Sequence, residues 1–230
     1  MSWIFKYVNS SIGKKQLMAV TGGCLLGFLL VHFVGNCTLL IPDESARAEA
    51  FNKVADTYAS LKFLLYVAEA GLVVLFGVHI VNALRTWREN RAARAAGYEV
   101  QTRVGDKSLP SFVMIYTGTF LLAWLVLHIL TFKFGKGVFA DIIPHDGQIT
   151  LYDVVSFWFS QSWYAAIYVI AMLCLGFHLW HGVGSVFQTL GLRHPKYTPI
   201  IEFCGKCYAA LIGGGNAIIV ITCFLREACK

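Results

Sequence analysis

Five of the seven histidines in the chain lie inside long apolar stretches, where a polar ring needs a partner. They are His32, His79, His128, His178 and His181. A neutral imidazole can donate a hydrogen bond from one ring nitrogen while the other nitrogen binds a metal ion. A single buried histidine is readily explained as a hydrogen bond between helices. Histidines in four successive apolar stretches instead favour a shared role, and ligation of a metal ion is the chemistry that suits them.

The apolar stretches that hold these histidines are long enough to cross a membrane. The chain is 57% hydrophobic and only 14% charged, and about 20 apolar residues in a helix span the hydrocarbon layer. Because lipid offers the backbone no hydrogen bonds, such segments must be helices. We expect five of them, at about 17–41, 61–84, 111–131, 163–187 and 208–225. The sequence therefore predicts an all-α membrane bundle that forms one domain over residues 1–230.

Basic residues predict the orientation of the bundle, since short cytoplasmic loops are enriched in Lys and Arg. Twelve of the 19 Lys and Arg residues precede the first span, join the second to the third, or join the fourth to the fifth. We therefore expect a multi-pass protein with its N-terminus in the cytoplasm and its C-terminus outside. The net charge of +6 then reflects topology, and no nucleic-acid partner is expected.

The depths of four histidines sort them into two pairs. The first and third spans run outward, so His32 and His128 lie about 22 and 25 Å from the cytoplasmic ends of their helices. The second and fourth spans run inward, so His79 and His178 lie about 8 and 14 Å from that side. Two imidazoles that face each other at one depth can supply both axial ligands of a b-type haem. The spacing therefore predicts two haems b, an outer one and an inner one.

The fourth span offers two histidines for one ligand position. His178 and His181 are about 60° apart around the helix axis, so both cannot point at one iron. Gly182 follows His178 by one turn on the same face, where a missing side chain would let a flat macrocycle approach. His181 has Gly184 and Ser185 on its own flank, which is a similar arrangement. Spacing thus favours His178 and leaves His181 as the alternative.

Four segments around these histidines carry a wider pattern. They read SSIGKKQLMAVTGGCLLGFLLVHFVGN at 10–36, GVHIVNALRTWREN at 77–90, LVLHILTFKF at 125–134 and FHLWHGVGSVFQTLG at 177–191. Together they resemble the five-helix, di-haem cytochrome b anchor of bacterial succinate dehydrogenase and fumarate reductase, over essentially the whole chain. The resemblance implies that His32 pairs with His128 and His79 with His178. It also selects His178, twelve residues before Leu190, as the ligand, and makes His181 a neighbouring hydrogen-bonding group.

The resemblance further implies partners and a role. Such anchors bind a flavoprotein subunit, which handles succinate or fumarate, and an iron–sulfur subunit, both on the cytoplasmic side of the bacterial inner membrane. Electrons pass between the iron–sulfur subunit, the two haems and a membrane quinone, commonly menaquinone. The sequence contains neither a flavin-binding glycine motif nor an iron–sulfur cysteine cluster. The chain is therefore expected to be the quinone-reactive subunit of the complex and not the subunit that converts the dicarboxylate.

Reduction of a quinone consumes two protons with two electrons, so its site needs an acid or an imidazole near a haem. Candidates in the outer loops are Glu49, Asp56, Asp141, His145 and Asp146. For each of them taken singly, an ordinary solvated loop charge is the favoured interpretation. Glu69, inside the second span, is a candidate proton relay or a hydrogen bond to a neighbouring helix. Some relatives have a glutamate two residues before the fourth-span ligand; here that residue is Gly176, so the carboxylate of that route is missing.

The propionates of a haem need cationic or hydroxyl partners near the membrane faces. By position, Arg85 and Arg88 are candidates for the inner haem and Lys133 is a candidate for the outer one.

Two other functions would use the same histidines. A di-haem cytochrome b subunit of a hydrogenase or formate dehydrogenase would carry similar pairs, and a haem-free transporter could use histidines that titrate. The haem content separates the transporter from the cytochromes, and the subunits that co-purify separate the two cytochromes.

Overall fold

A computed structural model of the chain describes residues 2–92, 109–145 and 147–228. All regular elements in these ranges are helices. Five of them are long and apolar enough to cross a membrane: Ser11–Leu40, Phe63–Ala92, Val113–Lys133, Ser162–Thr189 and Thr198–Ala228. The prediction of an all-α bundle with five spans is confirmed, and the chain has the architecture of a multi-pass membrane protein.

Thirteen helical segments follow one another along the described chain. They are α1 Trp3–Asn9, α2 Ser11–Asn36, η1 Cys37–Leu40, α3 Glu44–Ser60, α4 Phe63–Ala92, α5 Leu109–His128, η2 Ile129–Lys133, α6 Gly135–Val138, α7 Leu151–Ser160, α8 Ser162–Thr189, α9 Thr198–Ala209, η3 Ala210–Gly214 and α10 Gly215–Ala228. The segments η2 and η3 are π-helical turns that continue α5 and α9. Such turns re-phase a helix, and they are frequent at functional sites.

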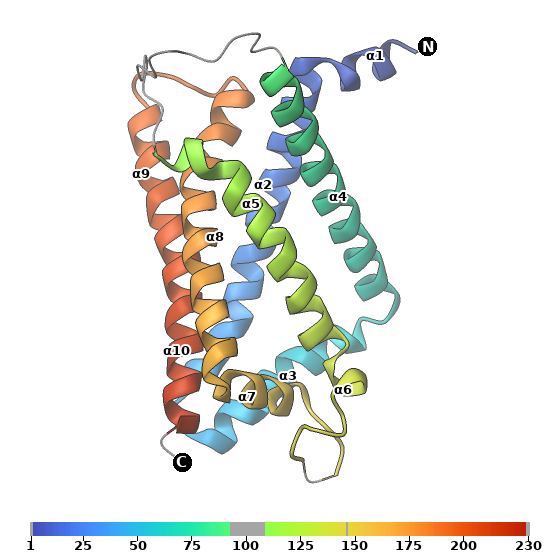
Figure 1. The fold of residues 1–230 in the computed structure, drawn as a ribbon, viewed down its shortest axis with the longest axis vertical. Helices are drawn as coiled ribbons and strands as arrows, with labels where there is room; N and C mark the ends of the chain where they lie inside the picture. The colour runs from blue at the N-terminus through green and yellow to red at the C-terminus, as the bar shows by residue number, and fades with distance from the viewer. Residues whose placement is uncertain (1, 93–108, 146, 229–230) are drawn as a thin grey trace.

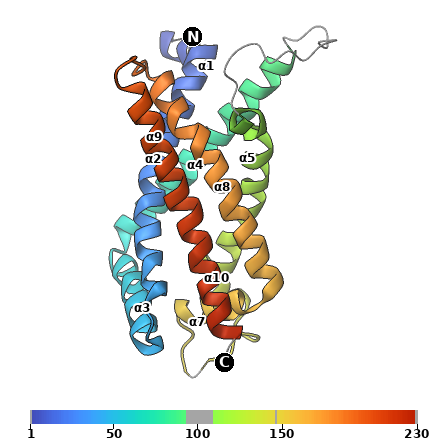
Figure 2. The ribbon, with the colours of Figure 1, turned by 90° about the vertical axis from the view of Figure 1, so that its left-hand side faces the viewer.

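The long helices run side by side, and the two chain ends lie at opposite ends of the bundle (Figures 1 and 2). Helix α8 is central, because it packs against α2, α5, α9 and α10. Helix α4 packs mainly against α2 and makes few contacts with α5. Of the four helices that carry the intramembrane histidines, α2 thus packs against both α4 and α8, and α5 packs against α8. Helices α9 and α10 also pack against α8.

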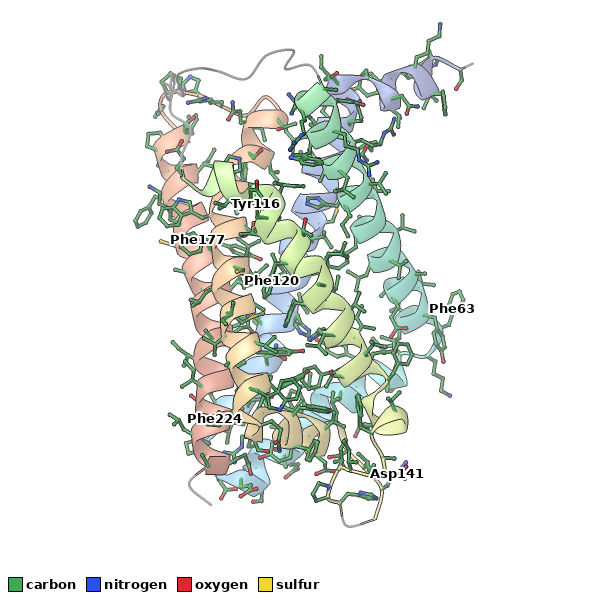
Figure 3. All side chains as sticks on the ribbon, in the orientation of Figure 1. Phe63, Tyr116, Phe120, Asp141, Phe177 and Phe224 are labelled. Carbon is green, nitrogen blue, oxygen red and sulfur yellow. The ribbon has the colours of Figure 1, made fainter. Side chains whose placement is uncertain are left out.

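Most of the side-chain core lies at the end of the bundle opposite the N-terminus. There α7, α8, α10, η1 and α3 bury an aromatic and aliphatic cluster that includes Phe51, Tyr152, Phe159, Tyr164 and Tyr168. In contrast, the most apolar part of the α4 span and of the α5 span contains no buried residue. Large apolar side chains cover the outside, as a lipid-facing surface requires; Phe63, Tyr116 and Phe177 are examples (Figure 3).

Two arginines at the core end satisfy carbonyls where the first span ends. Arg226 of α10 donates to the carbonyls of Leu39, Leu40 and Ile41 at 2.9–3.1 Å. Buried Arg47 of α3 donates to the carbonyls of Ile41 and Pro42 and to the hydroxyl of Tyr152. The last carbonyls of a helix have no partner within the helix itself, so these contacts fix the turn between the first span and α3.

Helix α3 begins at a conventional cap. The carboxylate of Asp43 accepts hydrogen bonds from the Ser45 hydroxyl at 2.6 Å and from the Ala46 amide at 2.8 Å. These bonds hold the pKa of Asp43 below its usual value. The cap fixes the start of a helix that crosses the base of the bundle (Figure 1).

Helix α8 and the π-turn η3 cross backbone to backbone. A Cβ atom on Gly213 would lie 2.8 Å from the Cα of Gly176 and 2.8 Å from the carbonyl oxygen of Met172. Only glycine fits at such an approach. Gly176 itself faces the backbone of η3, because a Cβ on it would lie 3.7 Å from the Cα of Gly213.

Candidate functional site

His32 of α2 and His128 of α5 come together near the core end of the bundle. Their ring centroids are 5.9 Å apart and their planes make an angle of 82°. Because a metal–nitrogen bond to imidazole is about 2 Å long, two rings on opposite sides of one ion have centroids about 6 Å apart. The separation of the rings therefore fits one metal ion between them.

His79 of α4 and His178 of α8 form the second pair, nearer to the N-terminal end of the bundle. Their pairing is the one that the sequence predicts, and the structure relates each ring to a neighbouring helix. Each lies beside a helix of the other pair: a Cβ on Gly22 of α2 would be 3.3 Å from the His79 ring, and a Cβ on Gly118 of α5 would be 3.4 Å from the His178 ring. The two glycines let these rings pack directly against helix backbone.

In this second pair, the Nδ1 atom of each ring faces a hydrogen-bond partner. Nδ1 of His79 is 3.4 Å from the Thr21 hydroxyl and 3.3 Å from the Met18 carbonyl oxygen. Nδ1 of His178 is 3.2 Å from the Thr117 hydroxyl. Metal-ligating histidines typically bond through one nitrogen to the protein and through the other to the metal. The arrangement leaves Nε2 of both rings for a ligand.

The first pair sits in an aromatic cage. Nδ1 of His128 is 3.2 Å from the hydroxyl of Tyr168, which also receives a hydrogen bond from Tyr164. The rings of Trp124 and Phe132 lie 5.2 and 5.4 Å from the His128 ring, centroid to centroid. His128 is thus oriented through Nδ1 in the same manner, but by a phenol.

An open position on α8 and two unpaired polar atoms lie near the histidines. Gly182, one turn after His178 on the same helix face, has no heavy atom within 4 Å of the place where a Cβ would lie. Thr86 Oγ1 and Trp124 Nε1 are buried with no hydrogen-bond partner among the described residues. Thr86 lies two turns after His79 and Trp124 one turn before His128, so each pair has an unused donor nearby. Open space and orphaned donors beside the rings fit a haem with polar substituents.

Within the described residues, no three His, Cys, Asp or Glu side chains converge as they would around a free metal ion. Two protein ligands per ion are sufficient only when the other ligands come from elsewhere, as they do in haem. His181 is half-buried and makes no ring contact with either pair among the described residues.

Glu69 and Lys133, predicted as a proton relay and a propionate partner, form an ion pair with each other. The pair joins α4 to the π-turn η2, and the two side chains remain 34% and 47% exposed. The π-turn begins directly after His128, so the pair lies close in sequence to the outer ligand. In this structure, the carboxylate of Glu69 and the ammonium group of Lys133 therefore neutralise each other.

Of the two basic residues expected at the inner haem, Arg85 bonds to helix α1. The guanidinium of Arg85 donates to the Asn9 side chain at 2.7 Å. Buried Lys14 pairs with Glu89, one helical turn after Arg85. Arg88 is exposed. Helix α1 is therefore fastened to the end of α4, which the sequence did not indicate.

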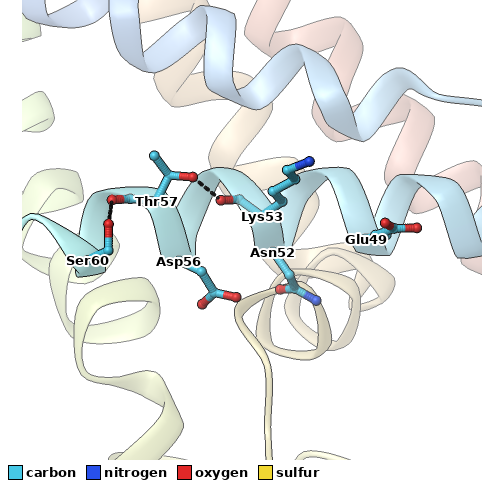
Figure 4. A pocket seen from close by; sticks show the side chains of 6 residues that line it. All are labelled: Glu49, Asn52, Lys53, Asp56, Thr57 and Ser60. Carbon is cyan, nitrogen blue, oxygen red and sulfur yellow. Dashed lines mark hydrogen bonds between the residues drawn. The ribbon is translucent and has the colours of Figure 1, made fainter.

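The quinone-site candidates lie on two separate elements. Glu49 and Asp56 are on the exposed face of α3, where they line an open depression of about 560 Å³ whose walls all come from this helix (Figure 4). Asp141 and His145 are exposed in the segment between α6 and α7, and Nδ1 of His145 is 2.8 Å from the carbonyl oxygen of Ile143. Asp146 lies outside the described residues.

The residues that sequence reasoning missed are the hydroxyl partners of the histidines: Thr21, Thr117 and Tyr168. A weak signal existed, because Thr21–Gly22 and Thr117–Gly118 place the same dipeptide in two spans. Comparison of the chain with protein-family models, with curated proteins and with solved structures gives no match.

Proposed function

We propose that the chain is a di-haem cytochrome b that carries electrons across the membrane. His32 and His128 would hold the outer haem iron, and His79 and His178 would hold the inner one. The observation that carries the proposal is the 5.9 Å approach of His32 and His128 from two helices that are distant in sequence. A hydrogen-bond partner on Nδ1 of three of these rings supports the same role, because it leaves Nε2 for iron.

When bound, haem supplies reversible one-electron chemistry at iron. The chain has to hold the four imidazoles in one orientation, keep water out and place the two sites in series along the bundle. The glycine contacts at His79 and His178 and the aromatic cage at His128 serve the first two needs. The different depths expected for the two pairs would place the two haems in series along the bundle.

Within this class, we propose the anchor subunit of a bacterial succinate dehydrogenase or fumarate reductase. The support is the resemblance of the four histidine-bearing segments to that family. An iron–sulfur subunit and a flavoprotein subunit would bind at the cytoplasmic end, and a membrane quinone such as menaquinone would exchange electrons with the haems in the bacterial cytoplasmic membrane. Glu49, Asp56, Asp141 and His145 remain candidates for the quinone site, and Glu69, paired with Lys133, remains one for proton transfer.

Haem counting on single histidine variants tests the proposal. Wild-type protein should give two haems b per chain by the pyridine haemochrome assay. Alanine at His32, His79, His128 or His178 should each remove about half of the pigment. His181→Ala and His145→Ala are matched controls that should retain both haems. A colourless wild type would contradict the proposal and favour a haem-free transporter, and co-purification with hydrogenase subunits would contradict the succinate dehydrogenase assignment alone.

A further inference from the structure

The inner histidine pair is flanked by two matching threonine–glycine dipeptides on different helices. Thr21–Gly22 of α2 lies against His79, and Thr117–Gly118 of α5 lies against His178. In each case the hydroxyl faces Nδ1 and the glycine backbone faces the carbon next to it. The repeated geometry points to a common task at the two rings.

At His79, the hydrogen bonds specify where the ring proton must be. The one hydroxyl proton of Thr21 is directed to its own helix, because Oγ1 is 2.7 Å from the carbonyl oxygen of Leu17. The oxygen can then only accept a hydrogen bond from His79. The Met18 carbonyl oxygen, 3.3 Å from Nδ1, is also an acceptor. Nδ1 must therefore carry the proton, and Nε2 presents its lone pair.

At His178 the same arrangement recurs. The hydroxyl of Thr117 lies 3.2 and 3.1 Å from the carbonyl oxygens of Val113 and Met114 in its own helix. Its oxygen is thereby available to accept from Nδ1 of His178, 3.2 Å away. Among the described residues, no backbone carbonyl bonds to Nδ1 of His178, in contrast to His79.

We propose that Thr21 and Thr117 are positioning residues that hold both inner histidines as the Nδ1–H tautomer and set the redox potential of the inner haem. This inference rests on the proposed function. A ligating imidazole that donates its N–H to an acceptor becomes a stronger electron donor to the metal. Stronger donation stabilises oxidised iron and lowers the midpoint potential. The outer pair has a phenol at His128 instead, so the threonines act on one haem only.

The test replaces each hydroxyl by a methyl group of similar size and titrates both haems potentiometrically. In Thr21→Val and Thr117→Val, we expect two haems per chain, a higher midpoint potential for the inner haem and an unchanged outer haem. The shift should be smaller for Thr21→Val, because His79 keeps the Met18 carbonyl, and largest in the double variant. Absence of the inner signal in His79→Ala identifies which signal is the inner one.

The controls separate hydrogen bonding from packing. Thr119→Val alters an exposed threonine of α5 that bonds only to the Ile115 carbonyl among the described contacts, and it should change neither potential. Thr21→Ser and Thr117→Ser retain the hydroxyl and should keep both wild-type potentials and the low-spin electron paramagnetic resonance signals of the ferric haems.

Three results would overturn the inference. They are unchanged potentials in both valine variants with both haems present, an equal shift of both haems, and loss of the inner haem that serine does not restore. Loss of the inner haem with valine that serine does restore would support it. In all of these cases the wild type contains two haems, whereas a wild type without haem contradicts the proposed function itself.

Discussion

The sequence assigns Glu69 and Lys133 to two different roles, but in the structure the two side chains form an ion pair. Both side chains are partly exposed, and ion pairs of that kind contribute roughly 0.2–1 kcal/mol. We expect Lys133→Met and Glu69→Gln to be non-additive by about this amount in a double-mutant cycle on thermal unfolding in detergent. Strictly additive effects would show that the pair does not form. A shift of the outer haem potential alone in Lys133→Met would support the role of Lys133 at a propionate.

At the level of single residues, the sequence indicated the histidines but not their hydrogen-bond partners. An intramembrane imidazole is conspicuous in any hydropathy reading, because its polarity is out of place there. A threonine is common in apolar helices, where its hydroxyl bonds to the preceding turn. Thr21 and Thr117 therefore become notable only once α2 is placed beside α4 and α5 beside α8.

At the scale of the elements, the crossing of α8 and η3 depends on the absence of a side chain. Gly213→Ala places a methyl group 2.8 Å from two backbone atoms, and overpacking of this kind costs about 1–3 kcal/mol. We expect a lower midpoint of thermal unfolding. Gly214→Ala is the matched control, because no heavy atom lies within 4 Å of its Cβ position. A Gly213→Ala protein as stable as Gly214→Ala would show that the two helices do not touch there.

The limits of the spans show what hydropathy misses. The fifth span was expected at 208–225, but the helix that contains it runs over Thr198–Ala228. Glu202 and Lys206 end the apolar window without ending the helix, because backbone hydrogen bonds continue through charged residues at the membrane face. The second span likewise continues to Ala92. The number of spans was predictable, whereas their ends were not.

At the scale of the whole molecule, the two chain ends lie at opposite ends of the bundle (Figure 1). With five spans, they are expected on opposite sides of the membrane. The excess of basic residues predicts that the N-terminus is cytoplasmic. Alkaline phosphatase fused after residue 230 should therefore be active outside, and the same reporter fused after residue 192, behind the fourth span, should be inactive. The reverse pattern would invert the bundle and place the inner histidine pair on the outside.

Hydropathy alone predicted the fold class and the number of spans, and helix geometry assigned each histidine an expected depth. These are local properties, because hydropathy and the rise per residue do not depend on which helices are neighbours. The packed helices were needed to show that His32 approaches His128, that Glu69 pairs with Lys133, that Arg85 bonds to Asn9 and that hydroxyls face Nδ1 of three histidines. Those contacts depend on how each helix is rotated and on which helix lies beside it, and packing between distant segments sets both.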